Sequence, residues 1–468
     1  MKRNNILLIN PWIYDFAAYD FWIKPVGLLS IGYYLEKYGY QTYLIDCLDR
    51  FHPLNPIVRK KKYGTGKFIR MPVEEPEILK HTPRKYCRYG MSLDSFLRAL
   101  HQLPEPDAVL VTSGMTYWYQ GPQYAIQVLK QEFPHVPIVL GGIYATLCYD
   151  HAIHNSGADY VIKGPGEIAA LRLVDSLTGN FHEIENKQVM FPKPDYCYYQ
   201  KLASIPIFTS IGCPYRCSFC ASHLLSGQFR QRNPEEVIDE IGNYYHKRHV
   251  RHFAFFDDAL LINQEKHLSV ILDGIIQKQF KINFHTPNGM HARQITKDLA
   301  ERMFKVNFKT MRLSYETSNR ARQKEMELKV TDDSLVNAID YLEAAGFRRK
   351  DLDVYVIMGL PEQSFEEVVE SMLFVTSLGV KARLTSFSPI PGTKDWQKSI
   401  ELYNMPPDID PLLTNNSIFP LNREDFSYDM FQKIKNLSKV LNYGLDHGIN
   451  FFNQSKIARF VFGYVKSL

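Results

Sequence analysis

The sequence lacks any run of about 18 consecutive apolar residues, the length that a membrane-spanning helix requires. Residues 1–5 lead directly into a strand-like segment, so we identify no signal peptide and expect a cytoplasmic protein. Charge of one sign is also scarce, because 55 Lys and Arg oppose 50 Asp and Glu and form no dense basic stripe. We therefore expect neither a transmembrane segment nor a nucleic-acid partner.

Cysteine is sparse along most of the chain. Of seven cysteines, four are scattered, at Cys47, Cys87, Cys148 and Cys197, which predicts reduced and mostly buried thiols in a protein without a secretion signal. The other three stand together as Cys213, Cys217 and Cys220. Three thiolates spaced C-x3-C-x2-C on one loop can face a single point and hold an iron-sulfur cluster. Alternatives are an unligated loop and a zinc site completed by His223.

The first part of the chain alternates short β-branched runs with helical patterns, which predicts an α/β fold with a doubly wound, Rossmann-like domain over residues 1–180. We expect an irregular insertion at about 52–89 and an extended linker over 181–202. The expected helices lie near 27–38, 122–132 and 168–177. The expected strands are 6–9, 41–45, 108–112, 137–140 and 160–162.

A second alternating series follows over residues 203–395. Six β/α units of this spacing predict an open, partial (β/α)6 barrel, with its chemistry at the carboxyl ends of the strands. One helix is expected at 234–245, with Asn233 as its N-cap. Residues 396–468 are expected to form a short helical extension. The expected strands lie near 206–211, 252–256, 282–286, 310–314, 353–358 and 382–386.

The cysteine loop follows the first strand of this second series, and with Tyr215 and Phe219 between its cysteines it resembles the signature of the radical S-adenosylmethionine (SAM) superfamily. The resemblance implies a 4Fe-4S cluster held by Cys213, Cys217 and Cys220, whose open iron is chelated by SAM. Reductive cleavage of SAM then yields methionine and a 5′-deoxyadenosyl radical, so that the cofactor carries the difficult chemistry.

Later strand ends resemble the family's SAM-binding segments. His291 stays open between an acid/base group and a structural histidine. Asp257 and Asp258 could equally form a helix N-cap, and Gly359 could be a turn residue. Together with Tyr215 and Phe219, the residues that the resemblance implies at SAM are Asp257, Asp258, Asn288, Arg293, Ser314, Glu316 and Gly359.

The first domain resembles the cobalamin-binding domain. Met115 stands where that family usually has leucine, and the Asp-x-His-x-x-Gly segment that supplies a histidine to cobalt is missing, His154 being its nearest candidate. We therefore expect cobalamin without a histidine lower ligand. Alternatively, the glycines serve only tight turns. The residues implied at cobalamin are Ser113, Met115, Thr116, Gly141, Gly142, Tyr144, Gly164 and Glu167.

The order of the two domains resembles the radical SAM subfamily that carries a cobalamin-binding domain. This implies a methyltransferase that acts on an unactivated carbon through the 5′-deoxyadenosyl radical and methylcobalamin, with an external electron donor such as flavodoxin or ferredoxin. Alternatives are cyclisation, rearrangement or oxidation without methyl transfer, a tRNA methylthiotransferase, which would need a second cysteine trio, and a non-catalytic cobalamin sensor. The substrate, whether small molecule, lipid or peptide, is not encoded in these motifs.

Overall fold

The computed structural model describes residues 4–57, 61–80, 82–184, 191, 193–326 and 329–449. These residues form two compact units. Unit 1 contains the described residues within 1–206, 224–227 and 408–417, and unit 2 contains those within 207–223, 228–407 and 418–468. Residues 450–468 of the expected carboxyl-terminal extension lie outside the described part.

Unit 1 is built on a parallel five-stranded sheet in the order β10-β9-β8-β1-β4. The chain passes from β1 to β4 on one side and then to β8 on the other, so the strand order reverses between β1 and β8, where doubly wound folds bind ligands. All five strands were predicted. They are β1 (Asn5–Asn10), β4 (Gln41–Asp46), β8 (Ala108–Val111), β9 (Ile138–Leu140) and β10 (Tyr160–Val161).

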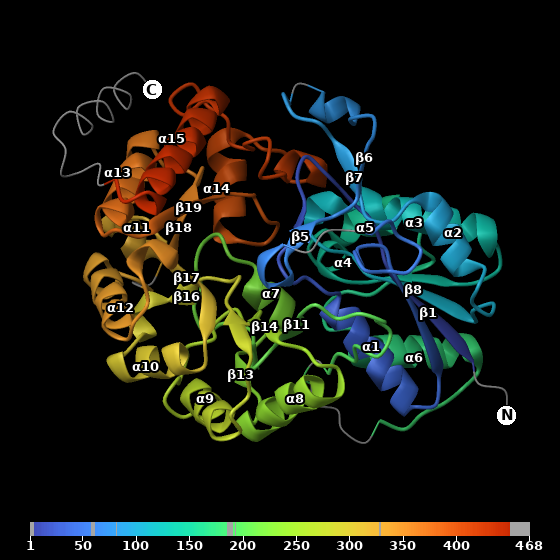
Figure 1. Ribbon diagram of the computed structural model, residues 1–468. Coiled ribbons are helices and arrows are strands. Elements are labelled where there is room, and N and C mark those ends of the chain that lie inside the picture. The colour runs from blue at the N-terminus through green and yellow to red at the C-terminus, as the bar shows by residue number, and fades with distance from the viewer. Residues whose placement is uncertain are drawn as a thin grey trace. The chain divides into compact units, whose positions relative to one another are not determined.

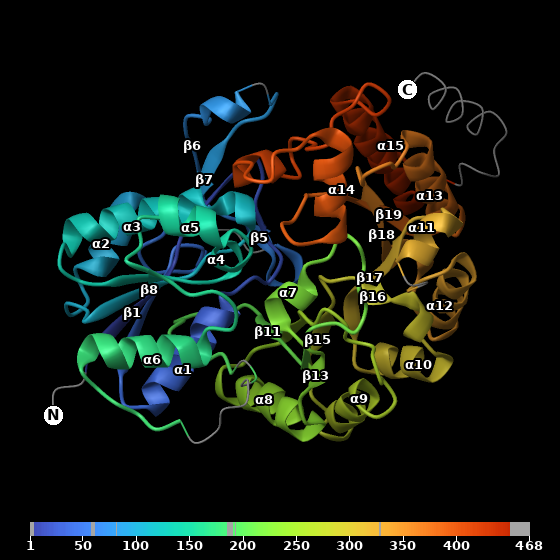
Figure 2. The same cartoon turned by 180° about the vertical axis from the view of Figure 1, so that it is seen from behind.

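Helices cover both faces of this sheet, because its strands are apolar on both sides. Leu8, Leu35 and Leu171 belong to one buried core between the sheet and two of these helices. Figure 2 shows α1 and α6 on one face and α2 and α3 on the other. The helices of unit 1 are α1 (Val26–Lys37), α2 (Leu93–Leu100), α3 (Gln120–Glu132), α4 (Ile143–Leu147), α5 (Tyr149–Asn155) and α6 (Glu167–Thr178).

The insertion is more regular than expected. Its strands pair with the chain that follows β1, giving the antiparallel orders β2-β7-β6 and β3-β5. The strands are β2 (Ile13–Asp15), β3 (Tyr19–Asp20), β5 (Gly66–Lys67), β6 (Arg70–Pro72) and β7 (Cys87–Tyr89). Single helical turns are η1 (Lys62–Gly64), η2 (Glu77–Leu79) and η3 (Thr116–Trp118).

Part of the expected carboxyl-terminal extension belongs to unit 1 instead. Residues 408–417, with η6 (Pro411–Thr414), are held there by two hydrogen bonds. Asn415 Nδ2 donates to Asp15 Oδ1 at 3.0 Å, and the Tyr119 hydroxyl donates to Asp410 Oδ2 at 3.1 Å. The expectation of one continuous extension therefore differs from the structure, because partners so distant in the chain leave no local signal.

Unit 2 holds the second sheet, whose strands run in chain order as β11-β14-β15-β17-β18-β19, with β16 beside β17. The six expected strands are present, and β14 to β19 are parallel. They are β11 (Ile205–Ile207), at the boundary of the units, β14 (His252–Phe255), β15 (Asn283–His285), β17 (Phe308–Glu316), β18 (Leu352–Met358) and β19 (Lys381–Ser386). Shorter strands are β12 (Ser210–Ile211), β13 (Arg230–Gln231) and β16 (Met290–His291).

Helices line the outside of this sheet, as Figure 1 shows for α8, α9, α10 and α12. The expected cap of α8 is present, since the Asn233 side chain accepts a hydrogen bond from the Glu235 amide. In the described residues no helix is both long and apolar enough to cross a membrane. The remaining elements are α7 (Ser222–Ser226), α8 (Pro234–Lys247), α9 (Leu268–Gln277), α10 (Lys297–Lys305), α11 (Arg320–Glu325), α12 (Asp332–Ala344), α13 (Phe365–Ser377), α14 (Lys394–Tyr403), α15 (Tyr428–Asp446), η4 (Ala292–Gln294) and η5 (Arg349–Asp351).

Candidate active site

The cysteine loop leaves β12 through Gly212, whose φ of 76° is a conformation that favours glycine. Cys213, Cys217 and Cys220 carry free thiols. Burial raises the pKa of all three thiols; for Cys217, burial together with the other two thiols raises the pKa to about 12. A metal centre binds thiolates and would displace these protons. The loop therefore carries three thiols that are close enough to influence one another's pKa and that are protonated in the absence of metal.

Asp257 anchors the chain just before this loop. Its buried carboxylate accepts hydrogen bonds from the amide and hydroxyl of Thr209, at 3.0 and 2.7 Å, and from those of Ser210, at 2.5 and 2.6 Å. All four donors converge on Oδ1 of this residue, which was expected to bind SAM. In the structure Asp257 therefore supports the loop, whereas its neighbour Asp258 is exposed.

A second anchor joins the cysteine loop to α14. The Ser218 hydroxyl, between the second and third cysteines, donates to Asp395 Oδ2 at 2.9 Å. The Asp395 amide donates back to the Ser218 carbonyl at 3.0 Å. Both residues are buried, so this reciprocal pair fixes the middle of the loop against the first turn of a helix.

Charged side chains gather around the thiols. Asp258 accepts a hydrogen bond from the Ser222 hydroxyl and raises the pKa of Cys213 and Cys220. Glu316 ends β17 at an irregular register and has a φ of 73°, a strained backbone of the kind found at functional sites. Burial raises the pKa of its carboxyl group.

Lys329 is the counter-charge that the sequence analysis missed. Burial opposes its charge, but Cys217 and Glu316, together with the other two thiols, raise its pKa. In the sequence Lys329 carries no motif and looks like any surface lysine. Only the fold places it beside the cysteine loop.

Two further predicted residues lie near His291. Tyr215 meets the His291 ring edge to face, with ring centroids 4.9 Å apart. Ser314 pairs with His291 across β16 and β17 and is buried. The expected SAM residues Tyr215, Ser314, Asp258 and Glu316 are thus spread over the cysteine loop and the carboxyl ends of the following strands, as the barrel requires.

Two other residues that were expected to bind SAM make contacts within the protein instead. The Asn288 side chain donates to the Phe256 and Asp257 carbonyls, at 2.9 and 3.3 Å. Phe219 packs into an apolar cluster that includes Leu360 and Phe387.

Gly359 and Arg293 complete the set. Gly359, with a φ of 95°, leaves room for the Phe419 ring, which would lie 2.6 Å from an added Cβ, so at its α-carbon this glycine serves packing. Arg293 lies in η4 and is exposed. Neither observation places these two residues at the thiols.

In the described residues, no three His, Cys, Asp or Glu side chains are grouped so that they could hold a metal ion. His223, the possible fourth zinc ligand, lies in α7, and its ring bonds to the Cys220 carbonyl.

The second candidate site lies at the carboxyl edge of the sheet of unit 1. The Ser113 hydroxyl donates to the Gly141 carbonyl at 2.6 Å, and the Ala145 amide donates to the Ser113 hydroxyl at 3.3 Å. Gly142, with a φ of 98°, lies so close that an added Cβ would be 2.4 Å from the Ser113 carbonyl oxygen. The loops after β8 and β9 are therefore locked together.

Open space lies next to two glycines of this edge. A Cβ built on Gly141 or on Gly164 meets no atom within 4 Å. The Gly164 amide donates to the Thr146 hydroxyl at 3.1 Å, which fixes its loop. This glycine cradle, formed by Gly141 and Gly164, fits the close approach of a large flat ligand such as a corrin.

The remaining expected cobalamin residues surround this edge. Met115 precedes η3 and Thr116 begins it, Thr116 being buried. Tyr144 is also buried: its ring stacks on Tyr119, and its hydroxyl lies 2.7 Å from His151 Nδ1. Glu167 begins α6 and accepts a hydrogen bond from the Ser30 hydroxyl.

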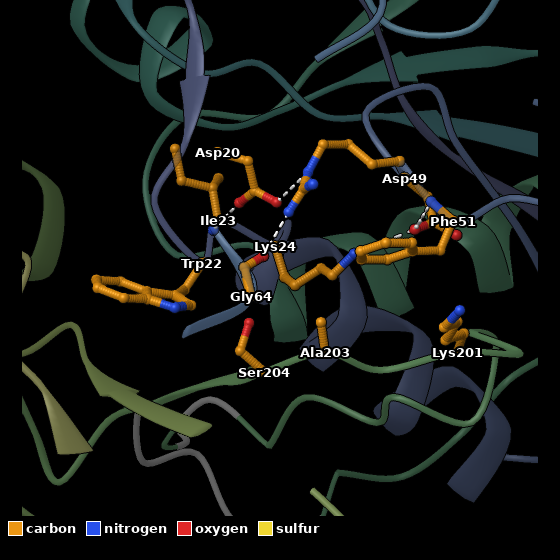
Figure 3. A pocket seen from close by; sticks show the side chains of 11 residues that line it. Asp20, Trp22, Ile23, Lys24, Asp49, Phe51, Gly64, Lys201, Ala203 and Ser204 are labelled. Atoms are coloured by element: carbon orange, nitrogen blue, oxygen red, sulfur yellow. Dashed lines mark hydrogen bonds and ion pairs between the residues drawn. The ribbon is translucent and has the colours of Figure 1, made fainter. Parts of the chain in front are cut away.

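A small cavity lies among the loops that follow β1 and β4. Figure 3 shows Lys24 and Asp49 across from Asp20 and Trp22. The buried Arg50 side chain donates to Asp20 at 2.7 Å and to the Gly64 carbonyl at 2.5 Å. The cavity has a volume of about 10 Å³, room for about one water molecule. It is too small to hold a cofactor.

Comparisons with known proteins agree with both sites. The model of the radical SAM superfamily matches residues 207–375, and that of the B12 binding domain matches residues 82–174. The first match contains the cysteine loop and the following strand ends. The second contains Ser113, Gly141, Gly142 and Gly164.

Two curated relatives are similar over most of their length. An uncharacterized methyltransferase from Pyrococcus horikoshii is 23% identical over 75% of this chain and 80% of its own. Cytidylyl-2-hydroxyethylphosphonate methyltransferase from Streptomyces wedmorensis is 20% identical over 84% of this chain and 81% of its own.

Among solved structures, the radical SAM methyltransferase TsrM from Kitasatospora setae, solved with tryptophan substrate and a SAM analog, has a similar fold. Its TM-score is 0.64 at 15% identity, covering 85% of this chain and 76% of that one. The domain matches and the fold thus agree with the arrangement expected from the motifs. The chain belongs to the radical SAM superfamily and carries a B12 binding domain before its radical SAM domain.

Proposed function

We propose that this protein is a cobalamin-dependent radical SAM methyltransferase that acts on an unactivated carbon. The observation that carries the proposal is that a cysteine-cluster loop with charged neighbours and an open glycine cradle occur in one chain. When bound, the 4Fe-4S cluster, SAM and cobalamin would supply an organic radical and a transferable methyl group. A carbon without an acidic proton needs such a route, because it does not readily become a nucleophile.

At the barrel site, Cys213, Cys217 and Cys220 would hold the cluster. Its open iron would be chelated by the amino nitrogen and the carboxylate of SAM. Asp258 and Glu316 offer carboxylates to the amino group, and Lys329 offers a positive charge to the carboxylate. The mutual influence of Lys329, Glu316 and the thiols supports this assignment.

In unit 1, Gly141 and Gly164 would leave the backbone open to cobalamin, while Ser113 and Gly142 fix the loops that carry them. Met115 and Thr116 lie on the neighbouring loop. No histidine stands in the position expected of a lower cobalt ligand. We propose that the lower face of the corrin meets no protein histidine.

The cluster needs one electron for each cleavage of SAM. An external donor such as flavodoxin or ferredoxin would supply it, because the protein contains no net source of electrons. The positive charge of Lys329 would favour an added electron on the bound cluster.

The test needs no knowledge of the substrate. The protein is reconstituted anaerobically with iron and sulfide, with or without hydroxocobalamin, then supplied with SAM and a reductant, and the SAM products are measured by mass spectrometry. A methyltransferase forms S-adenosylhomocysteine only with cobalamin, and 5′-deoxyadenosine in either case. Formation of 5′-deoxyadenosine alone would favour cyclisation, rearrangement or oxidation. Absence of both products would favour a non-catalytic sensor.

A further inference from the structure

His291 is buried with its hydrogen-bonding capacity unused. It is the last residue of β16 and is 2% exposed. Neither Nδ1 nor Nε2 has a hydrogen-bond partner among the residues that the structure describes. A buried polar group without a partner destabilises the folded protein. A histidine that served only the fold would have at least one of these bonds.

The ring of His291 is neutral. Burial lowers its pKa well below the usual range, and Lys329 lowers it further. A neutral imidazole has one N–H that donates and one nitrogen that accepts. A ligand that satisfies both ring nitrogens must therefore accept one hydrogen bond and donate another.

The segment that carries His291 is held in place, so the ring cannot easily move to reach a hydrogen-bond partner in the protein. The Tyr355 hydroxyl donates to the Pro287 carbonyl at 2.8 Å, and the Asn288 side chain is bound to the end of β14. An added Cβ on Gly289 would lie 2.3 Å from the Ser314 hydroxyl, so this segment is tightly packed against β17. The ring is thus held against Tyr215, on the cysteine loop.

The charged side chains of the site complement only one of the two halves of SAM. Its methionine half is charged and matches Asp258, Glu316 and Lys329, whereas its nucleoside half is uncharged and offers hydroxyl and purine edges that both donate and accept. We infer that His291 hydrogen-bonds the nucleoside half of SAM. This inference rests on the proposed function.

The test measures binding to the cluster-reconstituted protein. Dissociation constants for SAM, 5′-deoxyadenosine and methionine are compared between wild type and His291→Leu by equilibrium dialysis. We expect the variant to bind SAM and 5′-deoxyadenosine at least about tenfold more weakly and methionine unchanged. His291→Gln, which keeps a donor and an acceptor, recovers part of the loss.

Stability separates this role from a structural one. Because His291→Leu removes two unpaired polar atoms, its thermal midpoint without ligand stays equal or rises. The matched control is His267→Leu, since His267 is equally buried but its Nε2 lies 3.0 Å from the Arg232 carbonyl. That variant loses stability and keeps its affinity for 5′-deoxyadenosine.

Two results would overturn the inference while wild type binds SAM: an unchanged affinity of His291→Leu for 5′-deoxyadenosine, or a loss that falls on methionine. A wild-type protein with an intact cluster that binds neither SAM nor 5′-deoxyadenosine would instead remove the proposed function.

Discussion

Residue environment distinguishes the three cysteines of the cluster loop from the other four. Cys213, Cys217 and Cys220 influence one another and Lys329, whereas Cys197 is exposed and Cys47 is buried next to Asp46. Their spacing could be read from the sequence. The charged groups around them could not, because Lys329 and Glu316 come from different loops that only the fold brings together.

The acidic pair shows the same limit within two adjacent residues. Asp257 and Asp258 are equivalent in the sequence, and both were expected to bind SAM. The structure gives Asp257 four backbone and hydroxyl donors and leaves Asp258 exposed near the thiols. Side-chain direction at a strand end decides between the two roles, and no sequence pattern records it.

Replacing one cluster thiol should abolish the cluster. We expect Cys217→Ser, after anaerobic reconstitution, to retain less than about one iron per chain, against about four in wild type, because serine is a poor ligand for iron in a thiolate cluster. Iron and sulfide analysis with the visible absorption spectrum measures this. Cys197→Ser is the control and keeps the full iron content. Equal iron in both variants would contradict the assignment.

His285 should make folding sensitive to acid. Burial, together with the nearby His252 and Lys309, lowers its pKa to about 3. The unfolded chain binds this proton near pH 6.5 and the folded chain does not, so stability is full above about pH 6.5 and falls as the pH drops toward 3. The slope from this group is at most about 1.4 kcal/mol per pH unit.

Urea unfolding followed by circular dichroism between pH 7 and pH 4 measures that slope. His285→Gln should flatten it by up to one proton. An identical slope in His285→Gln and wild type would show that His285 is protonated in the folded protein.

At the scale of elements, two adjacent glycines after β9 should respond differently to alanine. Gly142→Ala meets Ser113 and a positive φ, so we expect a loss of about 1–3 kcal/mol in stability. Gly141→Ala points into open space and should keep or raise stability, yet weaken hydroxocobalamin binding at least about tenfold. Thermal unfolding and spectroscopic titration measure the two effects. Wild-type cobalamin affinity in Gly141→Ala would place the corrin elsewhere.

The strands and major helices were predictable because their signals are local. Buried parallel strands such as β1 and β8 are short apolar runs. The start of α8 is marked by Asn233 at its N-cap and Pro234 at its first helical position. The insertion was not, since β6 and β7 are only three residues long, and β7 depends on the distant β2 for one of its pairings.

At the scale of the molecule, the order of two domains carried most of the functional prediction. A glycine-rich doubly wound domain or a cysteine loop alone would leave many activities open, whereas the two together narrow them to one subfamily. Residues 408–417 escaped prediction because Asn415 bonds to Asp15, a partner from the opposite end of the chain.

Reductive cleavage of SAM would show directly that the cysteine loop holds an active radical SAM cluster. We expect the reconstituted wild-type protein, reduced under anaerobic conditions, to release 5′-deoxyadenosine and methionine in equal amounts, and Cys217→Ser to release neither. A wild-type protein that contains its full complement of iron and binds SAM, yet forms no 5′-deoxyadenosine on reduction, would contradict it.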